Sequence, residues 1–131
     1  MRSLLILFAL LLTQAAYAQE VLGQERWPDG TLRATRYSEG DRIHFITYHE
    51  NGKVKELGYF RNGRRDGVWK QYSEHGVMLA QASFRNGERQ GIWEFRNEAD
   101  IPNGRLTYTG GRLAQAEQFD AAGMITAQRV Y

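Results

Sequence analysis

Five arginines surround two Asn-Gly pairs in the middle of the chain, and guanidinium groups are well suited to bind phosphates and carboxylates. They are Arg61, Arg64 and Arg65 at the first pair and Arg85 and Arg89 at the second. If the two pairs lie side by side, these arginines favour an anionic partner: a lipid head group, a cell-wall phosphate or an acidic protein. The competing interpretation is a row of solvated turn charges that keeps the protein soluble.

Aromatic residues accompany the arginines at regular spacing. The candidates are Tyr48, Phe60, Trp69, Tyr72, Phe84 and Trp93. Exposed clusters of large rings commonly mark contact surfaces, so these residues and the five arginines form the predicted binding set. The alternative is that the rings simply pack on one another and on nearby glycines.

The chain lacks the residue sets that catalysis and metal binding require. It contains neither Gly-x-Ser-x-Gly nor His-Glu-x-x-His, and it has no cysteine. His49 and His75 occupy similar places in "YHENG" and "YSEHG", but no third ligand repeats with them, so turn decoration is favoured over a metal site. We therefore predict a protein that is not an enzyme and that uses no metal or cofactor.

The N-terminal segment has the three parts of a secretory signal peptide. Arg2 is followed by the apolar run "LLILFALLLT" at 4–13 and by "AYA" at 16–18. We expect residues 1–18 to be a signal peptide cut after Ala18, which gives a periplasmic or secreted protein; the alternative is an uncleaved anchor. The remaining chain has 16 basic and 15 acidic side chains, a balance that argues against a nucleic-acid partner.

A repeat of 24 residues organises the chain after this segment. "FRNGRRDGVW" at 60–69 returns as "FRNGERQGIW" at 84–93, with seven of ten letters unchanged. Turn sequences recur about every 12 residues, and the segments between them are rich in aromatic and β-branched residues. This pattern predicts antiparallel strands joined as consecutive hairpins.

The predicted strands carry mixed residues on both faces, which a sandwich core would not tolerate. In "GVWKQY" one face would bear Val68, Lys70 and Tyr72, and the other Gly67, Trp69 and Gln71. We predict an all-β, single-layer antiparallel meander with aromatic ladders across its strands. The repeated Gly-x-Trp would place a cross-strand ring over each bare glycine, Gly67 and Gly91. Residues 19–26 would be a short linker and residues 27–131 the repeat domain.

The segment "YFRNGRRDGVWKQYSEHG" and its neighbour resemble the variant MORN repeat, as found in bacterial proteins labelled YwqK-type antitoxins. The resemblance covers about 27–131 and is most specific at 48–95. It implies an elongated, non-catalytic β-sheet that binds another protein or a lipid surface. Proteins with the antitoxin label are usually intracellular, and the signal peptide departs from that pattern.

Together these features predict an exported, non-catalytic repeat module that binds a protein, with toxin neutralisation as one version. An envelope or anionic-lipid binder and a self-assembling structural repeat are the alternatives. Tyr131 falls inside the last predicted strand, so an open sheet edge is expected there, available for strand addition or self-pairing.

Overall fold

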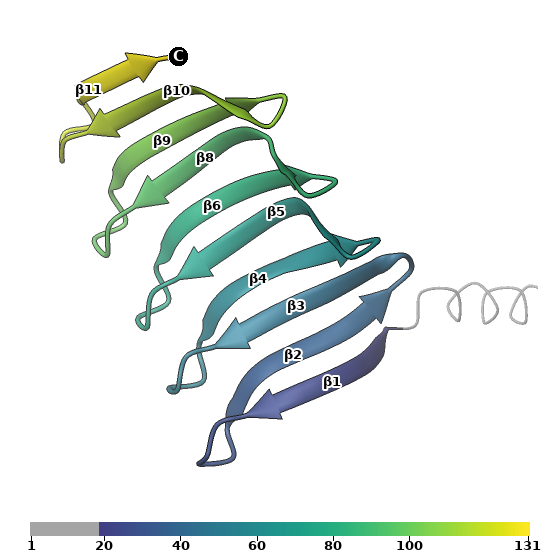
Figure 1. The fold of residues 1–131 in the computed structure, drawn as a ribbon. Coiled ribbons are helices and arrows are strands. Elements are labelled where there is room, and N and C mark those ends of the chain that lie inside the picture. The colour runs from purple at the N-terminus through teal and green to yellow at the C-terminus, as the bar shows by residue number, and fades with distance from the viewer. Residues whose placement is uncertain (1–18) are drawn as a thin grey trace, which may run out of the picture.

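The structure is a computed structural model that describes residues 19–131, and its strands form one antiparallel sheet in chain order (Figure 1). The predicted single-layer meander of hairpins is confirmed. None of the described residues is helical, so no helix among them could cross a membrane. The strands are β1 (Glu20–Arg26), β2 (Leu32–Glu39), β3 (Arg42–Tyr48), β4 (Val54–Arg61), β5 (Arg64–Tyr72), β6 (Met78–Arg85), β7 (Glu88–Arg89), β8 (Gly91–Arg96), β9 (Pro102–Thr109), β10 (Arg112–Phe119) and β11 (Ile125–Val130).

The segment predicted as a linker is instead strand β1. Residues 20–26 pair antiparallel with β2, from Glu20 opposite Ser38 to Arg26 opposite Leu32. The strand is almost wholly exposed, so backbone pairing with β2 holds it rather than burial, and the sequence pattern contained no apolar stripe to reveal it. The predicted signal peptide lies outside the described residues.

Two kinds of turn alternate along the chain and define the two edges of the sheet. The tight-turn edge has two-residue turns, at 40–41, 62–63, 86–87 and 110–111. Asn62 and Gly63 both have positive φ, 51° and 74°, as the type I′ hairpin turn requires. This geometry fixes the register in which Phe60 lies opposite Arg65.

The wide-turn edge, on the left in Figure 1, has five-residue turns at 27–31, 49–53, 73–77, 97–101 and 120–124. In each turn the first N–H donates to the carbonyl of the fifth residue, as His49 does to Lys53 at 2.8 Å. Where the repeat loses its glycine, Asp100 adopts the same left-handed backbone with φ 61°. Hydrogen bonding within the turn therefore preserves its shape after the sequence signal has decayed.

The recurring Gly-x-Trp marks a bulge in the strand. Gly67 and Gly91 both have φ 67°, a left-handed conformation that favours glycine, and the β4–β5 register jumps beside Gly67. Tyr59 lies over Gly67, as predicted, but among residues 19–131 only the chain neighbours of Gly91 would lie within 4 Å of a Cβ at that position. The prediction that a ring covers each of these glycines is therefore wrong for Gly91, and the left-handed bulge explains the repeat better. Trp69 covers a different glycine, Gly58, where an added Cβ would overlap the indole.

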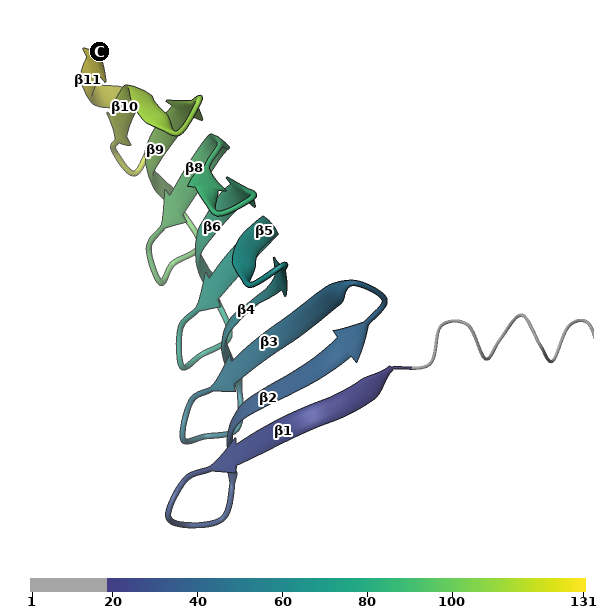
Figure 2. The same ribbon diagram turned by 45° about the vertical axis from the view of Figure 1, so that its right-hand side comes forward.

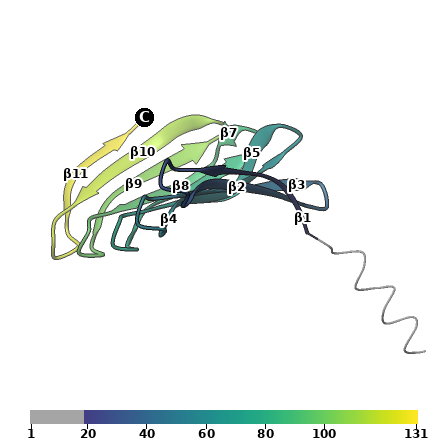
Figure 3. The ribbon, with the colours of Figure 1, turned by 90° about the horizontal axis from the view of Figure 1, so that it is seen from below.

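The sheet encloses very little. Among residues 19–131 the buried hydrophobic residues are Ala34, Trp69 and Tyr108, at 6%, 4% and 8% exposure. Figure 3 shows a single arched layer with no second layer against it, and Figure 2 shows its progressive twist. Stability must therefore come from contacts between neighbouring hairpins, as in other repeat proteins.

Candidate interaction surface

One face of the sheet, here called the aromatic face, carries a ladder of rings. The ring centroids are 6.3 Å apart for Phe45 and Phe60, and 5.0 Å apart for Phe60 and Trp69. The ladder resumes from Phe84 to Trp93 at 5.2 Å and ends at Tyr108, 5.0 Å beyond. These spacings and tilted geometries are the favourable ones for aromatic pairs, so the rings fix one another in place.

Two of the predicted arginines lie on this face and bridge its rings. The Arg65 guanidinium carbon is 4.5 Å from the Trp69 ring centroid and 5.5 Å from that of Phe84. Arg89, one repeat later, lies 5.9 Å from Trp93 and 5.7 Å from Tyr108. Both arginines remain exposed to solvent. Each therefore offers a charge that is held by cation–π contacts and can pair with an incoming anion.

A shallow groove of about 120 Å³ lies on the aromatic face between Trp69 and Trp93. Its remaining apolar lining includes Ala80, Ala82 and Phe84. Polar groups stand at its rim: the Glu56 carboxylate accepts a hydrogen bond of 2.9 Å from the Gln71 amide and lies 3.9 Å from Arg65. An apolar base with a charged rim suits a single apolar side chain of a partner protein.

The two tryptophans of the predicted set differ in what they can contact. Trp69 is only 4% exposed, so its main role is to pack between Gly58, Phe60 and Arg65. Trp93 is half-buried, and its Nε1 donates to the Ser83 carbonyl at 3.0 Å. Phe60 and Phe84 are also half-buried. The half-buried rings, rather than Trp69, therefore keep exposed area on this face.

Arg61 lies on the opposite face and is occupied by carboxylates. Its guanidinium is 3.2 Å from Asp41 and 3.6 Å from Asp66. Asp66 also accepts hydrogen bonds from the Tyr59 hydroxyl at 3.3 Å and from the backbone N–H of Asn86 at 3.1 Å. This cluster ties one tight turn to the next, which makes Arg61 a structural residue rather than a free charge.

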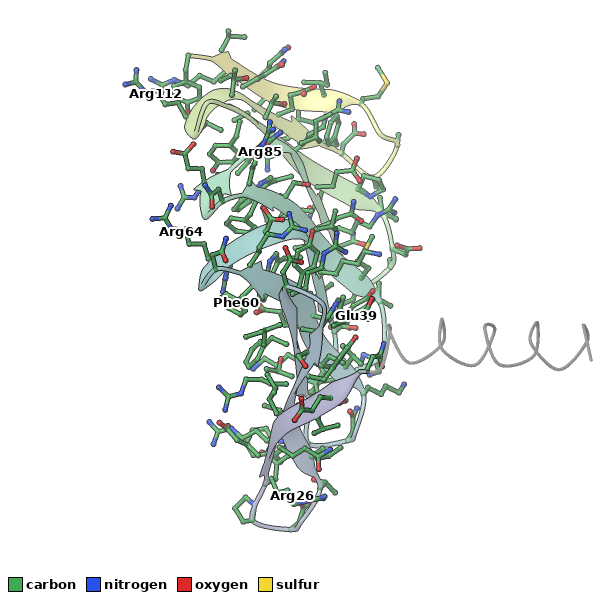
Figure 4. All side chains as sticks on the ribbon, turned by 90° about the vertical axis from the view of Figure 1, so that its right-hand side faces the viewer. Arg26, Glu39, Phe60, Arg64, Arg85 and Arg112 are labelled. Carbon is green, nitrogen blue, oxygen red and sulfur yellow. The ribbon has the colours of Figure 1, made fainter. Side chains whose placement is uncertain are left out.

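Arg64 and Arg85 project from the tight-turn edge, where Arg112 joins them. All three are exposed, and no carboxylate of residues 19–131 lies within 4.0 Å of any of them. Figure 4 shows Arg64 and Arg112 extending beyond the outline of the sheet. The sequence prediction missed Arg112 because its turn is Gly-Gly; its position 48 residues after Arg64, two full repeats, was the available signal.

Tyr48 and Tyr72 lie at the wide-turn edge, away from the aromatic ladder. Within residues 19–131 neither ring stacks on another aromatic ring. The carbonyl of Tyr72 is 2.8 Å from Nε2 of His49, and Nδ1 of His75 is 3.1 Å from the Glu98 carboxylate. The two histidines thus join successive wide turns, and the described residues hold no cluster of three or more side chains suited to a metal ion.

The two edges of the sheet have opposite charge. The wide turns contain six carboxylates against one lysine: Asp29, Glu50, Glu74, Glu98, Asp100 and Asp120 against Lys53. The tight turns with one flanking residue on each side, 39–42, 61–64, 85–88 and 109–112, contain five arginines against three carboxylates, and the wide turns counted in the same way gain only Arg26 and Arg96. The near-neutral net charge therefore conceals a basic edge and an acidic edge.

One carboxylate on the acidic edge has a perturbed pKa. The hydroxyl of Thr31 donates to Oδ1 of Asp29 at 2.6 Å, and the Thr31 backbone N–H donates to the same oxygen at 3.0 Å. These hydrogen bonds, the hydroxyl first, lower the pKa of Asp29 from its ordinary value because they stabilise the ionised form. The Asp29 carboxylate therefore stabilises the turn at 27–31.

Two residues of the ladder were absent from the predicted set. Tyr108 follows Phe84 by one repeat, so the spacing contained it, but the sequence around it lacks the Asn-Gly and Gly-x-Trp signals. Phe45 precedes Trp69 by one 24-residue step, so the spacing contained it as well, but Ile43 stands where the later repeats have the glycine of Gly-x-Trp. The faces of Arg65 and Arg89 could also have been inferred, because a two-residue turn places them directly opposite Phe60 and Phe84.

Comparison with known proteins supports the repeat assignment. The family model described as "MORN repeat variant" matches residues 43–62 and 65–86. No curated protein matches the chain. Among solved structures, the sheet is similar to a crystal structure of TarM, at 9% identity and a TM-score of 0.46. A second similar structure is that of a mutant of S. aureus TarM in complex with fondaparinux, alpha-GlcNAc-glycerol and UDP, at 8% identity and a TM-score of 0.48.

Each alignment covers 82% of this chain but only 23% of the TarM chain, so the chain spans less than a quarter of the length of either structure. Likenesses this distant indicate no function. The matched segments coincide with strands β3 to β6. The family match identifies two repeats of the MORN variant, within residues 43–86.

Proposed function

We propose that this protein is an exported, non-catalytic binding module whose aromatic face takes another protein. The observation that carries the proposal is the groove between Trp69 and Trp93, with the stacked guanidiniums of Arg65 and Arg89 beside it. Aromatic and arginine side chains are the residue types that dominate binding energy at protein interfaces. Because the guanidiniums are already held by ring contacts, little conformational entropy is lost when a partner binds.

The expected partner presents an apolar side chain flanked by a carboxylate. The apolar group would enter the groove, and the carboxylate would pair with Arg65 or Arg89. The resemblance to antitoxin-labelled proteins supports a toxin as this partner, in which case binding would neutralise it. The apolar and charged pattern of residues 1–18 supports export, so the toxin would act outside the cytoplasm.

The test is an affinity capture from envelope extract with matched variants on the two faces. Arg89→Ala removes a guanidinium from the aromatic face, whereas Arg42→Ala removes one that stacks at 4.7 Å on Tyr59, on the opposite face. We expect a stoichiometric partner with the unmodified protein and with Arg42→Ala, but not with Arg89→Ala. Equal retention or equal loss in both folded variants would refute the proposed surface.

A second candidate function follows from the basic edge. Arg64, Arg85 and Arg112 carry no carboxylate partner among the described residues and stand opposite the acidic wide turns. This arrangement would orient the sheet edge-on to an anionic envelope surface, with the acidic edge turned away. Sedimentation with phosphatidylglycerol vesicles tests it: binding should fall with salt and with replacement of all three arginines by glutamine. Equal binding to phosphatidylcholine vesicles would reject it.

A further inference from the structure

Both outer strands of the sheet have an unpaired side. Among residues 19–131, β1 pairs only with β2 and β11 pairs only with β10. The Tyr131 N–H donates to the Ala114 carbonyl at 3.0 Å, so Tyr131 faces β10. Antiparallel pairing alternates inward and outward groups, and Gln128, three residues earlier, therefore directs its N–H and C=O to the free side. Such a row of groups is a template for another strand.

Exposed apolar side chains concentrate at these two ends of the sheet. Nine large hydrophobic side chains of the described chain are exposed, and six belong to the ends: Val21, Leu22, Met124, Ile125, Val130 and Tyr131. Strand β11 has one charged residue, Arg129, and contains neither the proline nor the lysine that commonly protects an edge. Strand β11 therefore has the composition of a contact strand rather than that of a protected edge.

The directions of the two outer strands allow the sheet to continue into a second copy. Ten strands lie on the antiparallel path from β1 to β11, so the first and last run in opposite directions (Figure 1). Strand β1 of a second copy, placed beside β11, would thus preserve the antiparallel alternation. Tight and wide turns would also continue to alternate along the two edges.

One acidic side chain of β1, Glu20, and the one charged side chain of β11, Arg129, lie on the same face of the sheet. Directly opposed residues share a face, and Glu20 is connected in this way through Ser38 and Ile43 to Phe60. On the other end, Arg129 is connected through Ala116 and Leu106 to Trp93. Glu20 and Arg129 therefore both project on the aromatic face, where they can pair when β1 and β11 of different copies meet.

We propose that copies of this chain join end to end, with β11 of one copy paired antiparallel to β1 of the next. In the register that sets Arg129 opposite Glu20, Gln128 lies opposite Val21, and the pairing is regular up to the bulge of β1 at Leu22. The aromatic faces of the two copies then form one continuous surface. Because the contact joins two different edges, each added copy brings a free edge of its own, so the assembly grows beyond two copies, as an open chain or as a ring.

Contacts between two identical edge strands explain the exposed ends of the sheet less well. Pairing of two β11 strands leaves β1 of both copies bare, and it gives Arg129 no carboxylate because β11 contains none. Pairing of two β1 strands leaves β11 bare with its exposed Ile125 and Val130. The end-to-end contact covers both edges at once. It does not depend on which partner the aromatic face binds.

The assembly is tested by measuring the mass of the purified protein against concentration, by sedimentation velocity and light scattering. We expect the average mass to rise with concentration beyond that of two copies. Gln128→Pro removes the outward N–H but leaves the β10–β11 pairing, so it should give a monomer with an unchanged circular dichroism spectrum. A wild-type protein that stays monomeric, or that stops at two copies, would overturn the proposal.

A charge exchange between Arg129 and Glu20 tests the register of the β11–β1 contact and distinguishes this contact from nonspecific association. Arg129→Glu should raise the apparent dissociation constant roughly five- to tenfold, and adding Glu20→Arg should restore it. Arg112→Glu makes the same charge change at the tight-turn edge and should leave the assembly unaltered. If Arg129→Glu and Arg112→Glu weaken association equally, or if the double variant is not rescued, the proposed pairing is wrong.

Discussion

Replacing Trp69 with alanine should destabilise the protein by about 3 kcal/mol, near the lower end of the range for truncated core aromatics. The indole is 4% exposed, lies 5.0 Å from the Phe60 ring and 4.5 Å from the Arg65 guanidinium, and covers the backbone of Gly58. Burying roughly 200 Å² at about 25 cal/mol per Å² corresponds to about 5 kcal/mol. Two features of the site reduce this figure.

The first is that Nε1 of Trp69 is buried without a hydrogen-bond partner among residues 19–131, so truncation also removes an unfavourable group that costs about 1–3 kcal/mol. The second is that a single-layer sheet admits water into the vacated space, so no dry cavity persists. Urea unfolding followed by far-ultraviolet circular dichroism measures the change. Trp69→Phe is the matched control: it keeps a ring, removes the N–H and should cost less than about 1.5 kcal/mol. A loss below about 1 kcal/mol for Trp69→Ala, or an equal loss for both variants, would refute the reasoning.

Three further predictions test other parts of the sheet. Gly58→Ala should cost about 1–3 kcal/mol in urea unfolding because its Cβ overlaps the indole, whereas Gly104→Ala, whose Cβ would meet its nearest atom at 3.7 Å, should be nearly neutral. Asp66→Ala should cost about 2 kcal/mol in the same assay, since it removes the acceptor that ties two tight turns together. The pKa of Asp29, measured by NMR titration, should rise toward its ordinary value in Thr31→Val. Because folding lowers this pKa, its contribution to stability is present above the unfolded pKa and is lost as pH falls through the folded pKa.

The fold was predictable because its signals are local and repeat. A two-residue turn such as Asn62-Gly63 specifies both the hairpin and its register, and a second copy 24 residues later specifies the neighbour. Strand β1 was not predictable in this way. Its residues satisfy no pattern of their own, and the strand exists because β2 presents an unpaired row of backbone groups.

The candidate site was predictable by residue type but not by environment. The five arginines look equivalent in the sequence, yet carboxylates hold Arg61, rings hold Arg65 and Arg89, and Arg64 and Arg85 remain without a carboxylate partner among the described residues. The difference arises from alternation along a strand, which sends adjacent residues to opposite faces. The cross-strand register, including the shift beside Gly67, decides whether a carboxylate lies close enough to an arginine on the same face to pair with it.

The sheet separates its chemistry by simple geometric rules. Alternation along each strand assigns a residue to a face, and the type of turn assigns it to an edge, so the aromatic ladder, the basic tight turns and the acidic wide turns occupy different surfaces. Because each rule acts in every repeat, each surface extends along the whole sheet without any long-range packing. Such surfaces can be used at the same time: a protein on the aromatic face leaves the basic edge open to an anionic surface. The ends of the sheet are the fifth surface, and end-to-end pairing would lengthen the other four without changing their chemistry.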